Sequence, residues 1–191
     1  MPHARSSQPP TLHRRAFLSS ALGLALGAAG CGYLKANFAR TNALTQELDA
    51  YVFQQPFAMV WDKVTAVKGA DDPNKLFFAS PTWDDVDPTI KRTRPRTEKG
   101  KGAGNDVLVT TTFYEVHGQS DPGGCRMKYF YDETEVTLRD GKEVGTRHRN
   151  DRALFLELEL VRMFDPKSAA RIEAAGEEAA RSGEWYPKKK T

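Results

Sequence analysis

The stretch that ends at Cys31 constrains this chain more than any other feature of its sequence. Three arginines and no acidic residue precede Cys31, and an uncharged run rich in Leu, Ala and Gly extends from Phe17 to Gly30. A helix needs about 20 apolar residues to cross a bilayer, and this run is shorter. The order of positive charge, apolar run and small residues therefore predicts a cleaved export signal at residues 1–30.

The end of this run, Ala28-Ala29-Gly30-Cys31, resembles the lipobox of bacterial lipoproteins. The resemblance implies a diacylglycerol thioether on the Cys31 sulfur, cleavage after Gly30, and a fatty acyl chain such as palmitate on the new amine. Ala28 stands where Leu is the commoner residue. The alternative is an ordinary signal peptide whose apolar run happens to contain a cysteine.

A second resemblance overlaps the first. Arg14 and Arg15 are followed by one free position and then by Phe17 and Leu18, an arrangement similar to the twin-arginine export motif. This resemblance implies that the protein folds before export, which is compatible with a cofactor but requires none, and we expect none. The general secretory route is the alternative, because every signal peptide needs positive charge at its start.

Removal of the predicted signal changes the charge balance. Of the 28 Lys+Arg residues, three precede Cys31, so 25 basic side chains face 25 acidic ones in the mature chain. A nucleic-acid-binding domain would be expected to keep a basic surplus, so nucleic acid is not an expected partner. About 160 residues suffice for one domain. We expect a lipidated tether at residues 31–50, whose sequence fits a helix, a single domain at 51–182, and a tail at 183–191.

The patterns along the domain predict an α+β fold, with a small antiparallel sheet of three to four strands flanked by N-terminal and C-terminal helices. Residues 151–164 fit either a helix or a strand, whereas Asp165-Pro166 is typical of a helix start. The predicted order is a helix from Pro56 to about Gly69, a strand at 76–79, a polar loop at 80–106, strands at 107–117, 125–138 and 142–148 joined by turns at 118–124 and Asp140-Gly141, and a helix at 168–181.

This order of helix, meander and closing helix is similar to that of helix-grip domains, including those in the lipoprotein of the outer-membrane assembly machine. No shared motif accompanies the similarity, so it carries no function.

The predicted loop at 80–106 separates its charges by sign. Three aspartates, Asp84, Asp85 and Asp87, come before a basic half that could contact anionic lipid or the cell wall, although such charge blocks commonly stay solvated. The basic half consists of Lys91, Arg92, Arg94, Arg96, Lys99 and Lys101.

The mature chain offers little that points to catalysis. Its histidines, His117 and His148, have no metal-ligand spacing to other His, Cys or carboxylate residues. Cys125 is a lone thiol at the start of a strand, where a buried core residue is the expected role. Asp132, Glu133 and Glu135 crowd together, and Glu133 and Glu135 would share one face of a strand. We therefore predict neither a catalytic residue nor a metal site.

Two functional hypotheses follow. The first is a non-enzymatic envelope lipoprotein, held to the membrane by lipid on Cys31, that binds an envelope protein, the cell wall or anionic lipid. The second is an exported hydrolase or a carrier of a small apolar ligand, with a pocket between sheet and helices that could use His117, His148 or Cys125. Gly32 follows the cysteine where Asp would resemble an inner-membrane retention signal, so the outer membrane, facing the periplasm, is the expected location.

Overall fold

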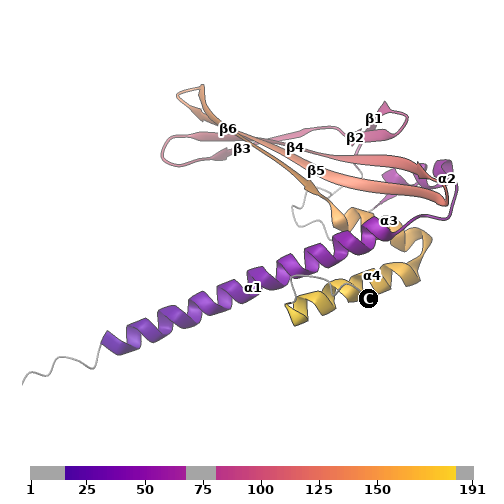
Figure 1. Cartoon of the computed structure of the whole chain (residues 1–191). Helices are drawn as coiled ribbons and strands as arrows, with labels where there is room; N and C mark the ends of the chain where they lie inside the picture. Colours follow the sequence, from indigo (N-terminus) through magenta and orange to yellow (C-terminus); the bar gives the residue numbers. More distant parts are fainter. Residues whose placement is uncertain (1–15, 68–80, 184–191) are drawn as a thin grey trace, which may run out of the picture.

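The computed structural model describes the backbone of residues 16–67 and 81–183, and the side chains from residue 33 onward within these ranges (Figure 1). The fold is α+β, as predicted, with helices around an antiparallel sheet. The elements are α1 (Ala16–Ala50), α2 (Phe57–Trp61), a short 3-10 helix (Val64–Ala66), β1 (Trp83–Asp87), β2 (Ile90–Thr93), β3 (Arg96–Lys101), β4 (Val107–Asp121), β5 (Gly124–Arg139), β6 (Lys142–Arg152), α3 (Leu154–Phe164) and α4 (Pro166–Ser182).

Six strands of the described part of the chain form one sheet, so the predicted number of three to four is too small. Its order is β1-β2-β4-β5-β6, and β3 also pairs with β4. The additional strands β1, β2 and β3 lie within residues 80–106, where the prediction of a polar loop is wrong. β1 and β3 are almost entirely exposed and carry no alternation of apolar and polar residues, while β2 is half-buried but has only one apolar residue, Ile90.

β2 and β3 occupy successive parts of the same edge of β4. Ile90 lies opposite His117, and Arg96 lies opposite Thr112. Pro95 falls between the two strands and has no N–H to give to a ladder, which accounts for the break. At this break the Thr93 hydroxyl accepts a hydrogen bond from the backbone N–H of Tyr114 at 2.9 Å. The hydroxyl thus replaces the backbone carbonyl that would accept this hydrogen bond in an unbroken strand.

The long β4–β5 hairpin also differs from its prediction. β4 continues to Asp121 and pairs there with Gly124, so residues 118–121 belong to a strand and not to the predicted turn. Asp140 and Gly141, by contrast, form the predicted tight turn between β5 and β6. Their φ angles of 52° and 75° are both positive, which is the geometry of a type I′ hairpin.

One face of the sheet packs on the helices and is called the inner face below. Its alternating residues Val116, Cys125 and Tyr129 are fully buried, together with Leu156 and Leu160 of α3. The prediction that Cys125 is a buried core residue is confirmed. Of the expected apolar stripe near Pro56, Val60 and Val64 are fully buried while Phe57 and Trp61 are partly buried, and α2 is shorter than predicted.

The C-terminal part of the chain is helical. Of residues 151–164, which fitted either a helix or a strand, 154–164 form α3, while Asp151 and Arg152 end β6. The predicted start of α4 is confirmed, because the Asp165 carboxylate accepts a hydrogen bond from the N–H of Ser168 at 3.0 Å and Pro166 is the first helical residue. The predicted strand at 76–79 and residues 184–191 of the predicted tail lie outside the described residues.

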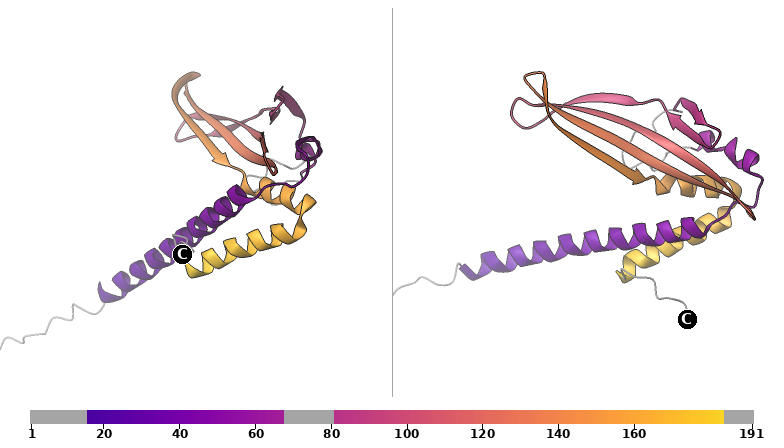
Figure 2. Two further views of the ribbon diagram at one scale, coloured as in Figure 1. Left: turned by 45° about the vertical axis from the view of Figure 1, so that its right-hand side comes forward. Right: turned by 45° about the horizontal axis from the view of Figure 1, so that its top comes forward.

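α1 and α4 form an antiparallel pair beneath the sheet (Figure 2). Arg40 pairs with Glu177 at 2.8 Å and Glu47 pairs with Arg171, which fixes the opposite directions of the two helices. Their close approach depends on Gly176, because a Cβ there would lie 2.9 Å from the Leu44 side chain. Residues 31–50, predicted as a tether whose sequence fits a helix, are therefore part of one continuous helix that joins the domain.

The sheet extends past α3, and Figures 1 and 2 show this part standing apart from the helices, above α1. We call it the wing: β3, residues 107–112 of β4, residues 133–139 of β5 and residues 142–150 of β6. Within the wing only Thr112 is buried, and β3 and this part of β6 are exposed at every position. The wing is held by strand pairing more than by packing.

Candidate functional site

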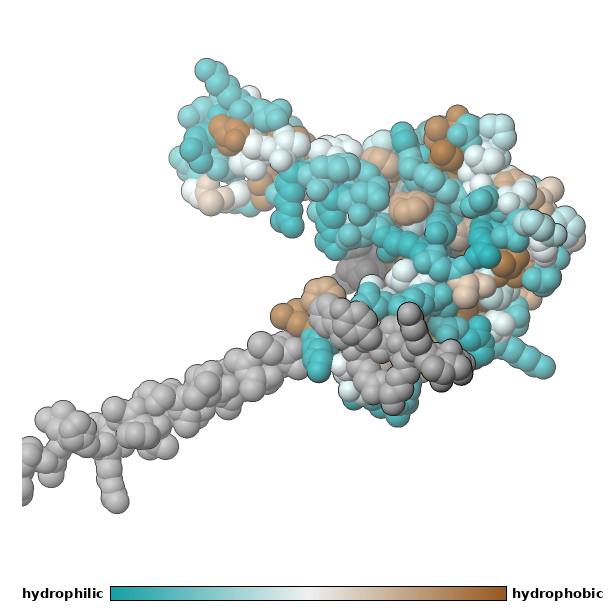
Figure 3. Space-filling view, in the orientation of Figure 1, coloured by the Kyte–Doolittle hydropathy of each residue, from teal (hydrophilic) through white to brown (hydrophobic). Residues whose placement is uncertain are grey.

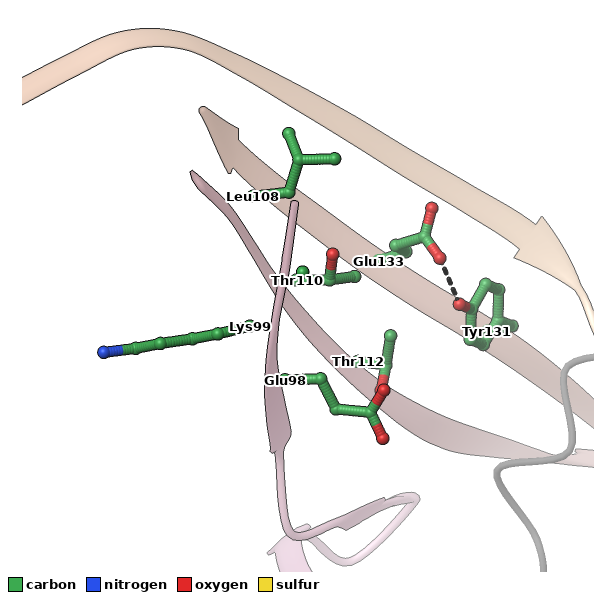
Figure 4. A pocket seen from close by; sticks show the side chains of 8 residues that line it. Glu98, Lys99, Leu108, Thr110, Thr112, Tyr131 and Glu133 are labelled. Atoms are coloured by element: carbon green, nitrogen blue, oxygen red, sulfur yellow. Dashed lines mark hydrogen bonds between the residues drawn. The ribbon is translucent and has the colours of Figure 1, made fainter. Parts of the chain in front are cut away.

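The inner face of the wing carries a recess of about 300 Å³ between β3, β4 and β5 (Figure 4). The side chains of Glu98 and Glu133 approach it from opposite sides, and the Lys99 side chain points away from it. The strand register accounts for this arrangement, since Glu98 lies opposite Thr110 and Glu133 opposite Thr112 on the two sides of β4. The lining residues are Glu98, Lys99, Gly100, Leu108, Thr110, Thr112, Tyr131 and Glu133.

The chemistry of this recess is that of a hydrogen-bonding surface. The Tyr131 hydroxyl donates to the Glu133 carboxylate at 2.5 Å, which leaves the carboxylate oriented and able to accept further hydrogen bonds. Glu133 and Glu135 share this face, as predicted, while Asp132 lies on the other face and receives a hydrogen bond from Asn150 at 3.0 Å. The predicted cluster of three carboxylates is thus divided between the two faces.

The opposite, outer face carries a second recess of about 380 Å³ near the other end of β4 and β5. His117 forms one wall, and its ring centre lies 4.9 Å from that of Phe130. Its Nε2 lies 3.1 Å from a Glu115 carboxylate oxygen, and the other Glu115 oxygen accepts from Arg92 Nε at 2.6 Å. The lining residues are Thr89, Ile90, His117, Gly118, Gln119, Arg126, Lys128 and Phe130.

These partners favour the ionised form of Glu115. Burial by itself raises the pKa of its carboxyl group, but hydrogen bonds from His117 and Arg92 outweigh this effect and leave the pKa below its ordinary value. The cations that line the recess are already paired in a similar way: Lys128 with Asp49 at 2.9 Å and Arg126 with Asp121 at 2.9 Å. The outer recess is a balanced network of ion pairs without a surplus of either charge.

The two histidines and the buried thiol do not form one site. Both histidines lie on the outer face, His117 opposite Lys128 and His148 opposite Thr134. These two partners are six residues apart on β5, so the histidines are separated by roughly 20 Å along the strands. His148 contacts Asp132 at 3.6 Å and Thr134 at 3.1 Å. Cys125 belongs to the inner face, where it is fully buried and burial raises the pKa of its thiol. A pair of Cys125 with either histidine is therefore excluded by the register.

The basic residues predicted for anion contact lie on β2, on β3 and, in the case of Arg94, between these two strands. Arg92 pairs with Glu115, and its guanidinium lies 4.8 Å from the Phe113 ring centre. The next two pair with acidic neighbours, Arg94 with Asp84 and Arg96 with Glu98. Lys91 pairs with Asp85 at 3.4 Å, while Lys99 and Lys101 have no ion pair to any residue that the structure describes. Four of the six are thus already paired with carboxylates, and contact of this group with an anion stays a prediction.

The free edge of β6 is the third feature. Its ten positions from Lys142 to Asp151 are all exposed, and among the described residues β5 is its only neighbour in the sheet. The outward-facing backbone groups of such an edge have no ladder partner and can pair with a further strand. The turn Asp140-Gly141 and the charged sequence after it predict a strand here. They indicate neither how far this strand extends nor that it lies at the edge of the sheet.

Sequence reasoning missed the residues of the inner recess. The signal available for them was the spacing of Thr110 and Thr112, which are two residues apart on β4, so that both hydroxyl groups lie on one face. The sequence analysis singled out Glu133 but not Glu98, because Glu98 lies on β3, a strand that was not predicted.

Within residues 33–67 and 81–183, no group of three or more His, Cys, Asp or Glu residues is placed to hold a metal ion. No helix in the described part of the chain is both long and apolar enough to cross a membrane. Arg14 and Arg15 lie outside the described residues, and the side chains of Phe17, Leu18 and Cys31 are likewise not described. Comparisons with protein-family models, curated proteins and solved structures find no match to this chain.

Proposed function

We propose that this protein is a lipid-anchored lipoprotein of the bacterial cell envelope whose domain binds a partner protein without catalysis. The anchor is supported by the sequence order of arginines, apolar run, small residues and Cys31. Gly32 after the cysteine favours the outer membrane. α1 runs without a break through residue 31 into the domain, so the lipid and the domain would be joined by a helix.

The wing is the observation that carries the binding role. It exposes both faces and the free edge of β6, and an extended segment of an envelope protein could add a strand along this edge. The separation of His117, His148 and Cys125 favours binding over the hydrolase alternative. The space between sheet and α3 is occupied by large buried side chains such as Tyr129 and Leu156, which disfavours a ligand pocket there.

The anchor has a direct test. Cells supplied with labelled fatty acid should label this protein, and Cys31→Ala should abolish the label and release the protein from the membrane. Fatty-acid label that persists in the Cys31→Ala variant would refute the lipoprotein proposal. The export route is tested by Arg14→Lys combined with Arg15→Lys, which keeps the charge. Precursor should accumulate if the twin-arginine route is used, and export should continue if the general secretory route is used.

The binding role is tested by a photo-crosslinking residue at Arg147, on the exposed edge, in cells that carry the otherwise native protein. We expect a discrete adduct with one envelope protein. The matched control is Arg181, which is also exposed but lies on α4 away from the wing. An absence of adduct at position 147, or the same adduct at both positions, would refute the wing as the binding surface.

A further inference from the structure

The free edge of β6 carries two arginines that have few partners in their own chain. Arg147 has no ion pair with any residue that the structure describes. Within the same part of the chain, Arg149 pairs only with Asp151, two positions further along the strand, and both side chains are about half exposed. Both cations are therefore accessible to a neighbour on the side of β6 that β5 does not occupy.

The register places both arginines on the inner face of the wing. Arg149 lies opposite Glu133 and Arg147 opposite Glu135 on β5, but the described contacts include no ion pair across the two strands here, and Glu133 accepts from Tyr131 instead. Residues two apart on a strand share a face, so the four charges lie on one surface. From β5 to β6 a pair of carboxylates is thus followed by a pair of cations. A further strand beside β6 would continue this alternation if it presented carboxylates.

The wing offers a partner little apolar surface. In the view of Figure 3 its projecting end is covered mainly by hydrophilic side chains, in teal, with only small brown areas. The one exposed large apolar residue of β6 is Val144, at 52%. Recognition at this edge therefore depends on the pairing of backbone groups and on side-chain charge. Opposite charges directly across two strands favour pairing, whereas like charges oppose it.

The same rule disfavours a second copy of the chain as the occupant of this edge. A symmetric antiparallel pairing of two β6 strands could be centred at Arg147, His148 or Arg149. Each of these three registers places arginine opposite arginine, because the two arginines are two positions apart. The charges of β6 thus favour a strand of the opposite sign.

We infer that the partner strand at β6 is acidic, with carboxylate side chains at alternate positions that lie opposite Arg147 and Arg149. This inference rests on the proposed function, because it names the chemistry of the segment that adds to this edge. Each guanidinium has five N–H donors, so it can bind a carboxylate of the partner as well as one of its own chain. Backbone pairing holds the segment, and the two charge pairs select its sequence and its register.

The test uses the mature chain from Gly32, without Cys31 and without any lipid. The buried hydrophobic residues that the structure describes lie between Ala39 and Ile172, so this chain keeps that core. Two synthetic peptides are titrated against it while the amides of β6 are followed by NMR. One peptide alternates glutamate with threonine, and the other alternates lysine with threonine. The glutamate peptide should shift the amides of residues 142–150 and bind more tightly than the lysine peptide by about fivefold or more.

Substitutions of the two arginines test which charges are responsible. Arg147→Gln with Arg149→Gln should weaken binding of the glutamate peptide about fivefold, since both charge pairs are lost. Arg147→Lys with Arg149→Lys keeps the charge and should bind this peptide nearly as well as the native chain. The matched control is Lys99→Gln with Lys101→Gln, which removes two exposed cations from β3 on the other side of the wing and should leave binding unchanged.

The outcomes separate the charge of the partner from the use of the edge. Equal binding of the two peptides would overturn the acidic partner but leave the proposed function standing, because the edge would still accept a strand. Absence of shifts with both peptides would overturn the inference. Shifts that depend on the concentration of the chain alone would assign the edge to a second copy and would also overturn it. A missing adduct in the photo-crosslinking experiment is a separate outcome, because it concerns the wing as a binding surface and not the charge of its partner.

Discussion

The ion pair between Arg152 and Glu157 allows a sharp test of how this fold is held together. Glu157, at the start of α3, is 3% exposed and accepts hydrogen bonds from Arg152 Nε at 2.7 Å and Nη2 at 2.6 Å, and from the N–H of Tyr129 at 3.0 Å. Arg152 also donates to Asp49 at 2.8 Å. The pair therefore joins the ends of β6 and α1 to α3 and the centre of β5.

The substitution Arg152→Met removes the cation and keeps most of the side-chain volume. It leaves the Glu157 carboxylate buried without a counter-charge, and breaking a buried pair in this way costs about 3–5 kcal/mol. For a domain of this size, 1 kcal/mol changes the melting temperature by about 2–4 °C, so the expected loss is about 10 °C. Glu157→Gln in the Arg152→Met background removes the unpaired charge but keeps an acceptor for Tyr129, and should restore much of this loss.

The pH dependence gives an independent readout. Burial raises the pKa of Glu157, and the hydrogen bonds from Arg152 offset only part of this effect. Arg152 behaves differently: burial lowers its pKa, but Glu157 and Asp49 outweigh this and raise it, so the arginine stays charged. Without Arg152 the pKa of Glu157 rises further. A carboxyl group with a raised pKa in the folded state contributes stability at low pH that is lost as pH rises through that pKa. The deficit of Arg152→Met should therefore shrink between pH 7 and pH 5.

The measurement is urea unfolding of the mature chain, followed by tryptophan fluorescence at both pH values. The matched control is Arg162→Met, because Arg162 also pairs with two carboxylates, Glu159 and Glu173, but at a more exposed position on the same helix. Such exposed pairs contribute about 1 kcal/mol or less. Equal costs for the two substitutions, or a deficit of Arg152→Met that does not change with pH, would refute the reasoning.

Two further predictions concern the hairpin end of the sheet. Gly124→Ala should lower the free energy of unfolding by about 3 kcal/mol, because the φ of Gly124 is 151° and a Cβ would lie 1.8 Å from the Phe53 carbonyl oxygen. The control is Gly123→Ala, whose Cβ would meet nothing within 4 Å, and it should be near neutral in the same urea assay. Cys125 in the mature chain from Gly32 should react with a thiol reagent only on unfolding, since it is fully buried and its pKa is raised. Rapid reaction of the native protein would contradict this.

Features decided by a few neighbouring residues could be predicted from the sequence. The turn at Asp140-Gly141 was predictable because both positions need a positive φ, which these residues adopt readily. The start of α4 was predictable because Asp165 can cap a helix and Pro166 has no N–H to leave unpaired. The α+β class followed from the same local signals.

Features decided by distant partners could not be predicted in this way. Gly118 belongs to a sequence typical of turns, but it lies within β4, where a Cβ would be 2.7 Å from the Phe57 ring and 2.9 Å from Trp61. It is therefore a glycine that permits α2 to pack on the sheet, and no neighbour in sequence indicates this. The sequence of α3 likewise fits either a helix or a strand, and only the position of the sheet that buries one of its faces decides between them.

The exposed strands of the wing could not be predicted from the sequence because distant residues hold them in place, and this has a consequence for function. Ordering a residue costs about 1–2 kcal/mol in backbone entropy, while a cross-strand pair returns only about 0.2–1 kcal/mol when no apolar surface is buried. The wing persists because β4 and β5 continue the register that the buried half of the sheet imposes. We therefore expect the amides of β6 between residues 142 and 150 to exchange with solvent faster than those of β5 near Tyr129, as hydrogen-exchange mass spectrometry can measure. A partner strand along β6 would bury these amides and slow their exchange. Slow exchange along β6 in the isolated mature domain would show that the wing is stable alone and would remove this argument for a partner.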